Sequence, residues 1–397
     1  MSEKRKFFIQ IALFVVTFIT TTHAGSEWTY GRSILYTPDY SWSDFFMGME
    51  FSIPFLLILT VHEFGHYFTA MYHRVRATLP YYIPMPPLPF SIGTLGAVIR
   101  LKQRVFSKKQ NFDIGLAGPL AGFIVSLVVL FYGFLTLPEP EYIFSIHPEY
   151  QQYGLDYAEH VYQNQGNNAA DITVGKNLLF LFFEKFVADP ARVPNPHEII
   201  HYPVIFAGFL SLIFTFMNLL PFGQLDGGHI AYGLFGFRLH RLIASFVFVA
   251  FIFYAGLGYI SPREELSSLV WSVPGMIAFL FFALTGLGLS RRDTLMYALL
   301  MFASQFTLAW LYPTLEGYPG WLLFGFLIGR FVGIPHPPSE IEEPLDAKRI
   351  VLGWLSLVIF VICFTPQPLV ITVPEPSEPT QHESVESSGT PLTDQSL

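Results

Sequence analysis

The sequence predicts an all-α membrane protein that crosses the bilayer about 7–9 times and carries a small β-hairpin at the cytoplasmic edge of the membrane. Of its 397 residues, 52% are apolar and only 13% are charged, about half the charged share of an ordinary soluble domain. Apolar stretches long enough to cross a bilayer recur along the chain. A proline-rich segment followed by residues of alternating polarity predicts the hairpin.

The charge and the cysteine content exclude other classes of protein. A formal charge of −8 argues against a nucleic-acid-binding protein, which is normally basic. The single cysteine, Cys363, excludes an internal disulfide framework and a cysteine-rich metal site. We therefore expect the lipid bilayer as a partner and no nucleic acid, while the oligomeric state stays open.

The first 25 residues form the first predicted membrane segment. Lys4, Arg5 and Lys6 precede an apolar run, and small polar residues follow it. This pattern is typical of a retained membrane helix or of a cleavable signal peptide, and we favour the retained helix. In both alternatives the chain emerges on the outer side, and a retained helix keeps its N-terminus in the cytoplasm.

The rest of the chain divides into a membrane core at 45–235, additional transmembrane helices at 236–373 and a tail at 374–397. The tail is rich in Pro, Ser, Thr and Glu, which predicts disorder. The run at 320–334 is short for a full span. The other runs predict spans at 45–71, 112–137, 203–235, 242–260, 269–289, 294–312 and 350–372.

Charged residues between the apolar runs predict the orientation. Residues 73–111 hold seven Lys and Arg and no Asp or Glu, so the positive-inside rule places them in the cytoplasm. The segment 138–200 holds nine acidic residues. It predicts an extracytoplasmic loop with short amphipathic helices rather than an independent domain.

The predicted hairpin lies within the cytoplasmic segment. Five prolines between residues 78 and 92 forbid a regular helix. Apolar and basic residues then alternate from Ile99 to Lys102, the period of a strand.

The second apolar run contains His62-Glu63-Phe64-Gly65-His66. Histidines four residues apart project from one face of a helix, so both can reach one metal ion, and Glu63 beside them can take a proton from a metal-bound water. Zinc suits such ligands and lowers the pKa of a bound water. Three ionisable side chains in an apolar helix also favour a polar cavity. The alternative is a pair of histidines that form hydrogen bonds between helices.

A catalytic zinc needs a third protein ligand and one open position. Asp226 is the best candidate, because Pro and Gly residues interrupt the fourth apolar run around it, and irregular backbone at membrane depth is tolerated mainly where it lines a cavity. A helix-capping role for Asp226 is the alternative. His229 is a rival ligand, and His336 is expected to be a turn residue without a chemical role.

These residues resemble the site-2 protease family of intramembrane zinc metalloproteases, in the branch with extra C-terminal transmembrane helices. The resemblance implies that His62, His66 and Asp226 bind one zinc ion per chain, that Glu63 is the catalytic carboxylate, and that transmembrane proteins are the substrates. It spans residues 45–370 and is carried by His62-Glu63-Phe64-Gly65-His66, Gly118-Pro119-Leu120-Ala121-Gly122, Asn218-Leu219-Leu220-Pro221 and Leu225-Asp226-Gly227-Gly228-His229.

Three further residues have two possible roles each. Gly118 lets helices approach closely and Pro119 can kink the span; the resemblance places their helix beside the active site, and packing alone explains them equally well. Asn218 could stabilise a developing oxyanion, although a hydrogen bond between helices is the simpler explanation.

The predicted strand could offer an edge for an unwound substrate to pair with. The residues expected to form this edge are Gly93, Thr94, Gly96 and Val98.

The leading hypothesis is hydrolysis of peptide bonds in or near transmembrane segments, by zinc-activated water with Glu63 as general base. The alternative is a membrane metal-binding or transport protein that uses the same ligands without proteolysis. We expect an integral protein of a prokaryotic plasma membrane with its active site near the cytoplasmic side; an organelle membrane is the other possibility.

Overall fold

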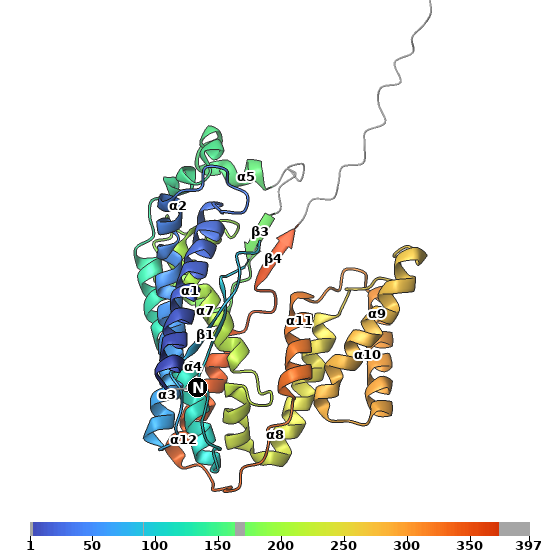
Figure 1. The fold of residues 1–397 in the computed structure, drawn as a ribbon. Helices are drawn as coiled ribbons and strands as arrows, with labels where there is room; N and C mark the ends of the chain where they lie inside the picture. Colours follow the sequence, from blue (N-terminus) through green and yellow to red (C-terminus); the bar gives the residue numbers. More distant parts are fainter. Residues whose placement is uncertain (1–2, 90, 163–170, 373–397) are drawn as a thin grey trace, which may run out of the picture.

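The computed structural model describes residues 3–89, 91–162 and 171–372, which form a largely helical protein (Figure 1). The helices are α1 (Glu3–Tyr30), α2 (Trp42–Met47), α3 (Met49–Tyr72), α4 (Lys108–Leu135), α5 (Tyr157–Val161), α6 (Leu178–Phe186), α7 (Pro203–Asn218), α8 (Asp226–Ala255), α9 (Leu266–Leu284), α10 (Arg291–Leu311), α11 (Gly320–Leu327) and α12 (Ala347–Cys363). The strands are β1 (Tyr81–Pro84), β2 (Thr94–Val98), β3 (Asp171–Val174) and β4 (Leu369–Thr372). The predicted tail at 374–397 lies outside the described residues.

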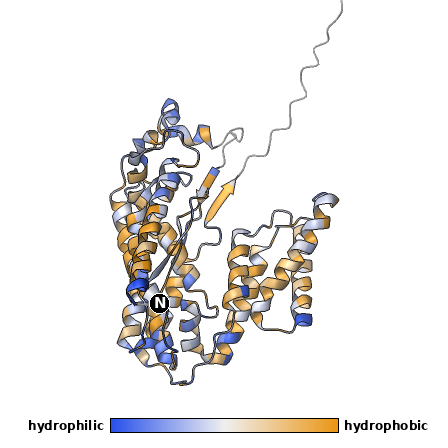
Figure 2. Cartoon of the chain, in the orientation of Figure 1, coloured by the Kyte–Doolittle hydropathy of each residue, from blue (hydrophilic) through white to orange (hydrophobic). Residues whose placement is uncertain are grey.

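The polytopic membrane architecture is confirmed. Within the described ranges, six helical segments are long and apolar enough to cross a membrane, and α7 and α11 are shorter apolar helices. Apolar residues dominate the long helices, as Figure 2 shows in orange. The six segments are Glu3–Tyr30, Trp42–Tyr72, Lys108–Leu135, Asp226–Ala255, Leu266–Leu287 and Arg291–Leu311.

The apolar run at 203–235 is interrupted before Asp226, as its Pro and Gly residues predict. It divides into α7 and the start of α8, because Pro221 and the left-handed Gly223 (φ 48°) interrupt the helix. The next predicted span, 242–260, is the second half of α8, which bends at Gly236 (φ 71°) and ends at Ala255.

The last predicted span, 350–372, is wrong at its C-terminal end. The helix α12 ends at Cys363, and Pro366 and Pro368 prevent it from continuing. The chain then forms β4, which pairs antiparallel with β3.

Helices α3, α4, α7 and the first half of α8 pack together around the centre of the core, and α1 packs against α3. Aromatic rings fill this centre: Phe51 of α3 and Phe206 of α7 are fully buried, with ring centroids 5.6 Å apart. Helices α9, α10 and α11 form a second group of helices that joins the core through α8 (Figure 1). The core therefore corresponds to the region where the predicted ligands lie.

The small β-hairpin is confirmed, although its second strand begins earlier than the alternation at 99–102 predicts. Strand β1 pairs antiparallel with β2, with Tyr81 opposite Val98 and Tyr82 opposite Ala97. Residue 101 forms only an isolated bridge with Ala77. The hairpin lies along α1 and reaches α3.

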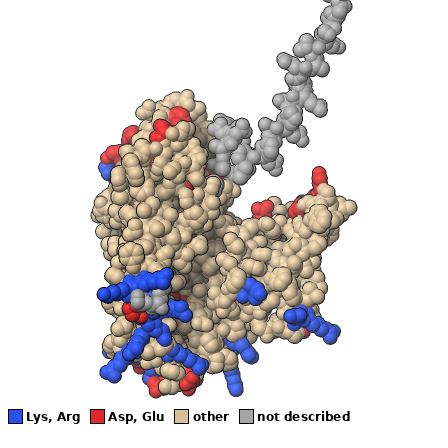
Figure 3. Space-filling model, viewed as in Figure 1, with Lys and Arg blue, Asp and Glu red and all other residues tan. Residues whose placement is uncertain are grey.

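The two ends of the molecule differ in charge. Lys and Arg side chains gather, with some Asp and Glu among them, at the end where α1 and α12 begin, whereas the opposite end shows mainly Asp and Glu (Figure 3). Residues 138–162 and 171–200 contain the short helices η1 (Pro140–Ser145), η2 (Pro148–Asp156), α5 and α6, and η3 (Ile199–His201) follows; α5 lies at that opposite end (Figure 1).

Candidate metal centre

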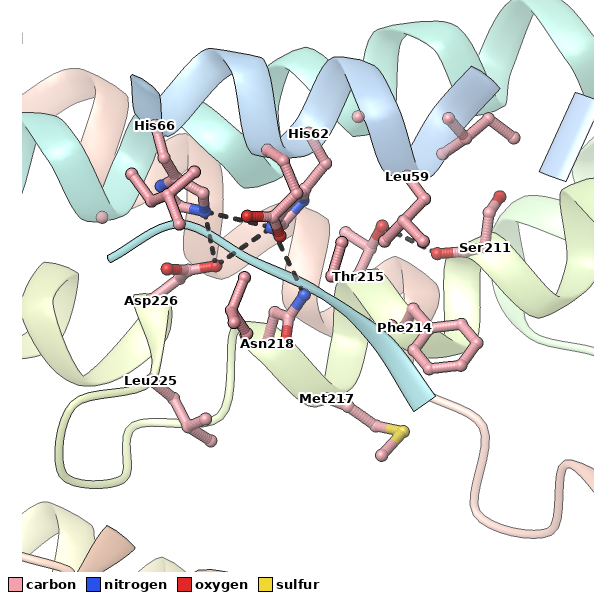
Figure 4. Close-up of a pocket in the computed structure, with 18 of the residues that line it drawn as sticks. Leu59, His62, His66, Ser211, Phe214, Thr215, Met217, Asn218, Leu225 and Asp226 are labelled. Atoms are coloured by element: carbon pink, nitrogen blue, oxygen red, sulfur yellow. Dashed lines mark hydrogen bonds and ion pairs between the residues drawn. The ribbon is translucent and has the colours of Figure 1, made fainter. Parts of the chain in front are cut away.

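Helix α3 carries the histidine pair on one face. His62 and His66 are one helical turn apart, and both imidazoles are buried and directed toward α4 and the α7–α8 connection (Figure 4). Glu63 is buried beside them, with 5% of its surface exposed. The helix continues for six residues beyond His66 and ends at Tyr72, about 9 Å further on at 1.5 Å per residue, so the pair lies nearer to the basic end of the molecule.

The break between α7 and α8 brings Asp226 to the same place. Asp226 is the first residue of α8, and its Oδ2 lies 3.4 Å from Nε2 of His62 and 3.3 Å from Nε2 of His66. The two Nε2 atoms are 3.1 Å apart. Three potential ligand atoms from two separate segments of the chain therefore form one triangle.

This triangle fits a tetrahedral ion. A metal with bonds of about 2.0–2.1 Å to nitrogen and oxygen ligands has ligand atoms about 3.3–3.4 Å apart. The observed edges of 3.1, 3.3 and 3.4 Å match this spacing. Two imidazoles and one carboxylate are also a donor set that zinc accepts, and three protein ligands leave a fourth position for water or substrate.

The imidazole of His66 is oriented by a hydrogen bond from its far side. Its Nδ1 lies 2.7 Å from the backbone carbonyl oxygen of Ile114. A carbonyl only accepts, so Nδ1 carries the proton and Nε2 presents its lone pair to the other ligand atoms. Metal-binding histidines commonly have such a partner, which fixes the tautomer and the ring orientation.

Glycines of α4 provide the space for the rings. A Cβ atom at Gly118 would lie 2.1 Å from Nε2 of His66, and one at Gly122 would lie 3.1 Å from Cβ of His62. A Cβ atom at Gly115 would lie 2.6 Å from Cβ of His229. The motif that contains Gly118 and Pro119 thus lies directly against the histidines, and the glycine has a defined steric role.

Asn218 is close to the ligand atoms. It ends α7, and its Nδ2 lies 3.5 Å from Nε2 of His62 (Figure 4). The side chain reaches the potential metal ligands from α7, on the other side of the break from Asp226.

A cavity of about 430 Å³ opens at this group. Its walls come from α3, α4, α7, the start of α8 and the strand β2, so the hairpin borders the same cavity as the histidines. In Figure 4 β2 passes in front of the ligand group. Of the four residues predicted for the strand edge, Gly96 and Val98 line the cavity, whereas Thr94 is buried and Gly93 precedes the strand.

His229 does not join the three ligand atoms. Its Nδ1 lies 2.8 Å from Nε2 of His336, whose own Nδ1 donates to the carbonyl oxygen of Pro337. Burial lowers the pKa of His336 to about 3, so this ring stays neutral and its Nε2 accepts the hydrogen bond from His229. His336 is buried and stacks on Tyr232, which gives it a packing role in the connection after α11.

Sequence reasoning missed two residues of α4 that lie against histidines: Ile114, whose carbonyl oxygen orients His66, and Gly115, which faces His229. The carbonyl of Ile114 carries no sequence signal, because every residue has one. The glycines did carry a signal, since positions 115, 118 and 122 share one face of a helix. Only the motif around Gly118 was recognised.

The fold and this group of side chains define a polytopic membrane protein with a buried His-His-Asp site suited to a metal ion. The chain belongs to peptidase family M50, because the sequence model of this family matches residues 50–260, more than half of the chain. This membership confirms the predicted relation to site-2 proteases.

Curated relatives are similar to the same region. The chain is 30% identical over 181 residues to the probable zinc metalloprotease EGY1, chloroplastic, of Oryza sativa subsp. japonica, a match that covers 46% of this chain and 27% of that protein. It is 29% identical over 179 residues to its Arabidopsis thaliana counterpart, covering 45% and 28%. It is 25% identical over 224 residues to the probable zinc metalloprotease EGY2, chloroplastic, of Oryza sativa subsp. indica, covering 52% and 36%. The matches thus span about a third or less of these relatives' length, and no solved structure matches the chain.

Proposed function

We propose that this protein is an intramembrane zinc metalloprotease that hydrolyses peptide bonds in or near transmembrane segments of other proteins. The observation that carries the proposal is the triangle of Nε2 of His62, Nε2 of His66 and Oδ2 of Asp226, with edges of 3.1–3.4 Å. Membership of a peptidase family and relatives named as probable zinc metalloproteases support it.

Each residue of the site has a part in this reaction. His62, His66 and Asp226 would hold one zinc ion, which would lower the pKa of a nearby water and polarise the scissile carbonyl. Glu63 takes a proton from the attacking water and later gives it to the leaving amine. Asn218 donates a hydrogen bond to the carbonyl oxygen as negative charge develops on it.

The substrate must unwind before it reacts, because a membrane helix hides its carbonyl groups in its own hydrogen bonds. Strand β2 borders the cavity, and Val98 at its end is half exposed. An unwound substrate segment pairs with this strand and so brings an extended backbone to the metal site. The apolar cavity walls then contact the substrate side chains.

The proposed orientation follows from charge. Lys and Arg gather near the start of α1, so this end faces the cytoplasm, or the equivalent compartment of an organelle, under the positive-inside rule. The N-terminus and the active site then lie toward that side, and the segment 138–200 faces the outside. A prokaryotic plasma membrane remains our proposal for the membrane; the chloroplastic relatives make a plastid membrane the alternative to test.

The experiment uses the purified full chain in lipid vesicles with a panel of single-span membrane proteins as substrates. Glu63→Gln removes the general base and keeps a side chain of similar shape. We expect the wild type to cleave at least one substrate, and Glu63→Gln to bind zinc with wild-type stoichiometry while cleavage falls below detection. Zinc transport into vesicles that survives in Glu63→Gln, without cleavage by the wild type, would overturn the proposal in favour of a transporter.

A further inference from the structure

A second group of potential ligands lies at the acidic end of the molecule, away from the His62 site. His147 immediately precedes η2, whereas Glu198 and His201 flank or lie within η3. One ligand atom of each, either an imidazole nitrogen or a carboxylate oxygen, lies within 4.8 Å of the others. We propose that these three side chains bind a second divalent transition-metal ion, of the class of zinc, at the outer end of the core.

The two imidazoles face each other with the same geometry as the pair in α3. Nε2 of His147 lies 3.2 Å from Nε2 of His201, close to the 3.1 Å between the histidines of the first site. Nε2 of His201 is also 3.7 Å from Oε2 of Glu198. The edge between the histidines fits a tetrahedral ion with bonds of about 2.0–2.1 Å, and a small rotation of the carboxylate completes the triangle.

Both rings are held with a lone pair directed into the group. Nδ1 of His201 lies 2.6 Å from the backbone carbonyl oxygen of Thr29, and Nδ1 of His147 lies 3.0 Å from Oε1 of Glu149. Each of these oxygens accepts, so each Nδ1 donates, and in the neutral rings both Nε2 atoms direct a lone pair into the group. Two lone pairs 3.2 Å apart repel unless a cation lies between them.

Glu198 provides an independent indication. Its side chain is 1% exposed, and within the described residues Oε2 has no hydrogen-bond partner. The other oxygen, Oε1, accepts a hydrogen bond from the hydroxyl of Tyr162. A buried carboxylate oxygen without a partner is costly. A metal ion at the two Nε2 atoms would satisfy it.

The second ion would connect three segments that are distant in the sequence. His147 precedes η2, Glu198 and His201 lie at η3 just before α7, and Thr29 orients His201 from the end of α1. Tyr202 follows η3 and directly precedes α7. The ion would therefore have a structural role and hold the outer segment against α1 and α7. The first site, in contrast, lies nearer the basic end.

The test measures metal stoichiometry in the full chain. The purified protein in detergent is stripped with a chelator, dialysed against Zn²⁺ and assayed for bound zinc by mass spectrometry. We expect two ions per chain for the wild type and one each for His147→Gln and Glu198→Gln. We expect one for His62→Ala as well, and none for the double variant His62→Ala/His147→Gln. His147→Gln is the mildest change, because this ring is a quarter exposed.

His197→Gln is the matched control. His197 lies next to Glu198 in the chain, but its Nδ1 contacts Oδ1 of Asp171 at 2.7 Å and its ring stacks on Tyr162. The variant His197→Gln should therefore retain both zinc ions. Equal zinc content in His147→Gln, Glu198→Gln and the wild type would overturn the inference, and so would loss of an ion in His197→Gln. If His62→Ala keeps every ion and His147→Gln loses one, the second site stands and the proposal for the first site fails.

Discussion

Gly118 of α4 faces His66 so closely that a Cβ atom at position 118 would lie 2.1 Å from Nε2. Real Cβ atoms do not make such a contact, so the imidazole would have to leave its position. Nε2 of His66 also lies 3.3 Å from Oδ2 of Asp226. The glycine is therefore a condition for the ligand geometry as well as for helix packing.

Gly118→Ala should lower zinc affinity about 10–100-fold, the usual cost of disturbing a group that positions a metal ligand. Cleavage should fall with it, because the displaced ring no longer meets Asp226. Equilibrium dialysis with Zn²⁺ measures the affinity. Gly275→Ala is the matched control, since Gly275 is also helical and a Cβ atom there meets nothing within 4 Å. Wild-type affinity in Gly118→Ala would contradict the steric role.

Asn218→Ala should lower kcat by about 10²–10³-fold, the typical cost of losing one oxyanion donor, and leave zinc content unchanged. The reason is that Nδ2 lies 3.5 Å from Nε2 of His62 and is not itself a ligand. Steady-state cleavage and zinc content measure the two effects.

Asn177→Ala is the control for Asn218→Ala. Asn177 forms hydrogen bonds with Thr365 outside the site, so its loss should lower thermal stability and leave kcat unchanged. If Asn218→Ala likewise lowers thermal stability and leaves kcat unchanged, the role of Asn218 is a hydrogen bond between helices.

Val98→Pro should reduce cleavage about 3- to 10-fold and leave zinc content intact. Proline removes one backbone N–H group, and one hydrogen bond contributes about 0.5–1.5 kcal/mol. Val98→Thr keeps the N–H group and the branched side chain, so it should cleave like the wild type. Equal cleavage by both variants would argue against substrate pairing at β2.

Much of this protein could be predicted from local patterns. The long helices follow from runs of apolar residues, and the His62–His66 pair follows from the helical period. Asp226 could be proposed because Pro and Gly residues surround it. In contrast, the strand that follows α12, β4, pairs with β3 across about 200 residues of sequence, and no local pattern indicates such a partner.

The orientations of the functional side chains could not be predicted from the sequence either. The contact of His201 with His147 depends on how the outer segment folds back over α1. The carbonyl of Ile114 positions His66 through the packing of α4 on α3. Both contacts join segments that are far apart in the sequence, and no local sequence pattern indicates that these segments pack together.

The most direct test of the account is X-ray absorption at the zinc edge for His147→Gln, a variant expected to hold zinc at the first site alone. We predict two imidazoles and one carboxylate oxygen at about 2.0–2.1 Å, and loss of this zinc on adding Asp226→Ala. Asp113→Asn, which changes a carboxylate of α4 that pairs with Arg349, should retain it. An unchanged zinc spectrum and affinity after Asp226→Ala would contradict the claim that Asp226 shares one ion with His62 and His66.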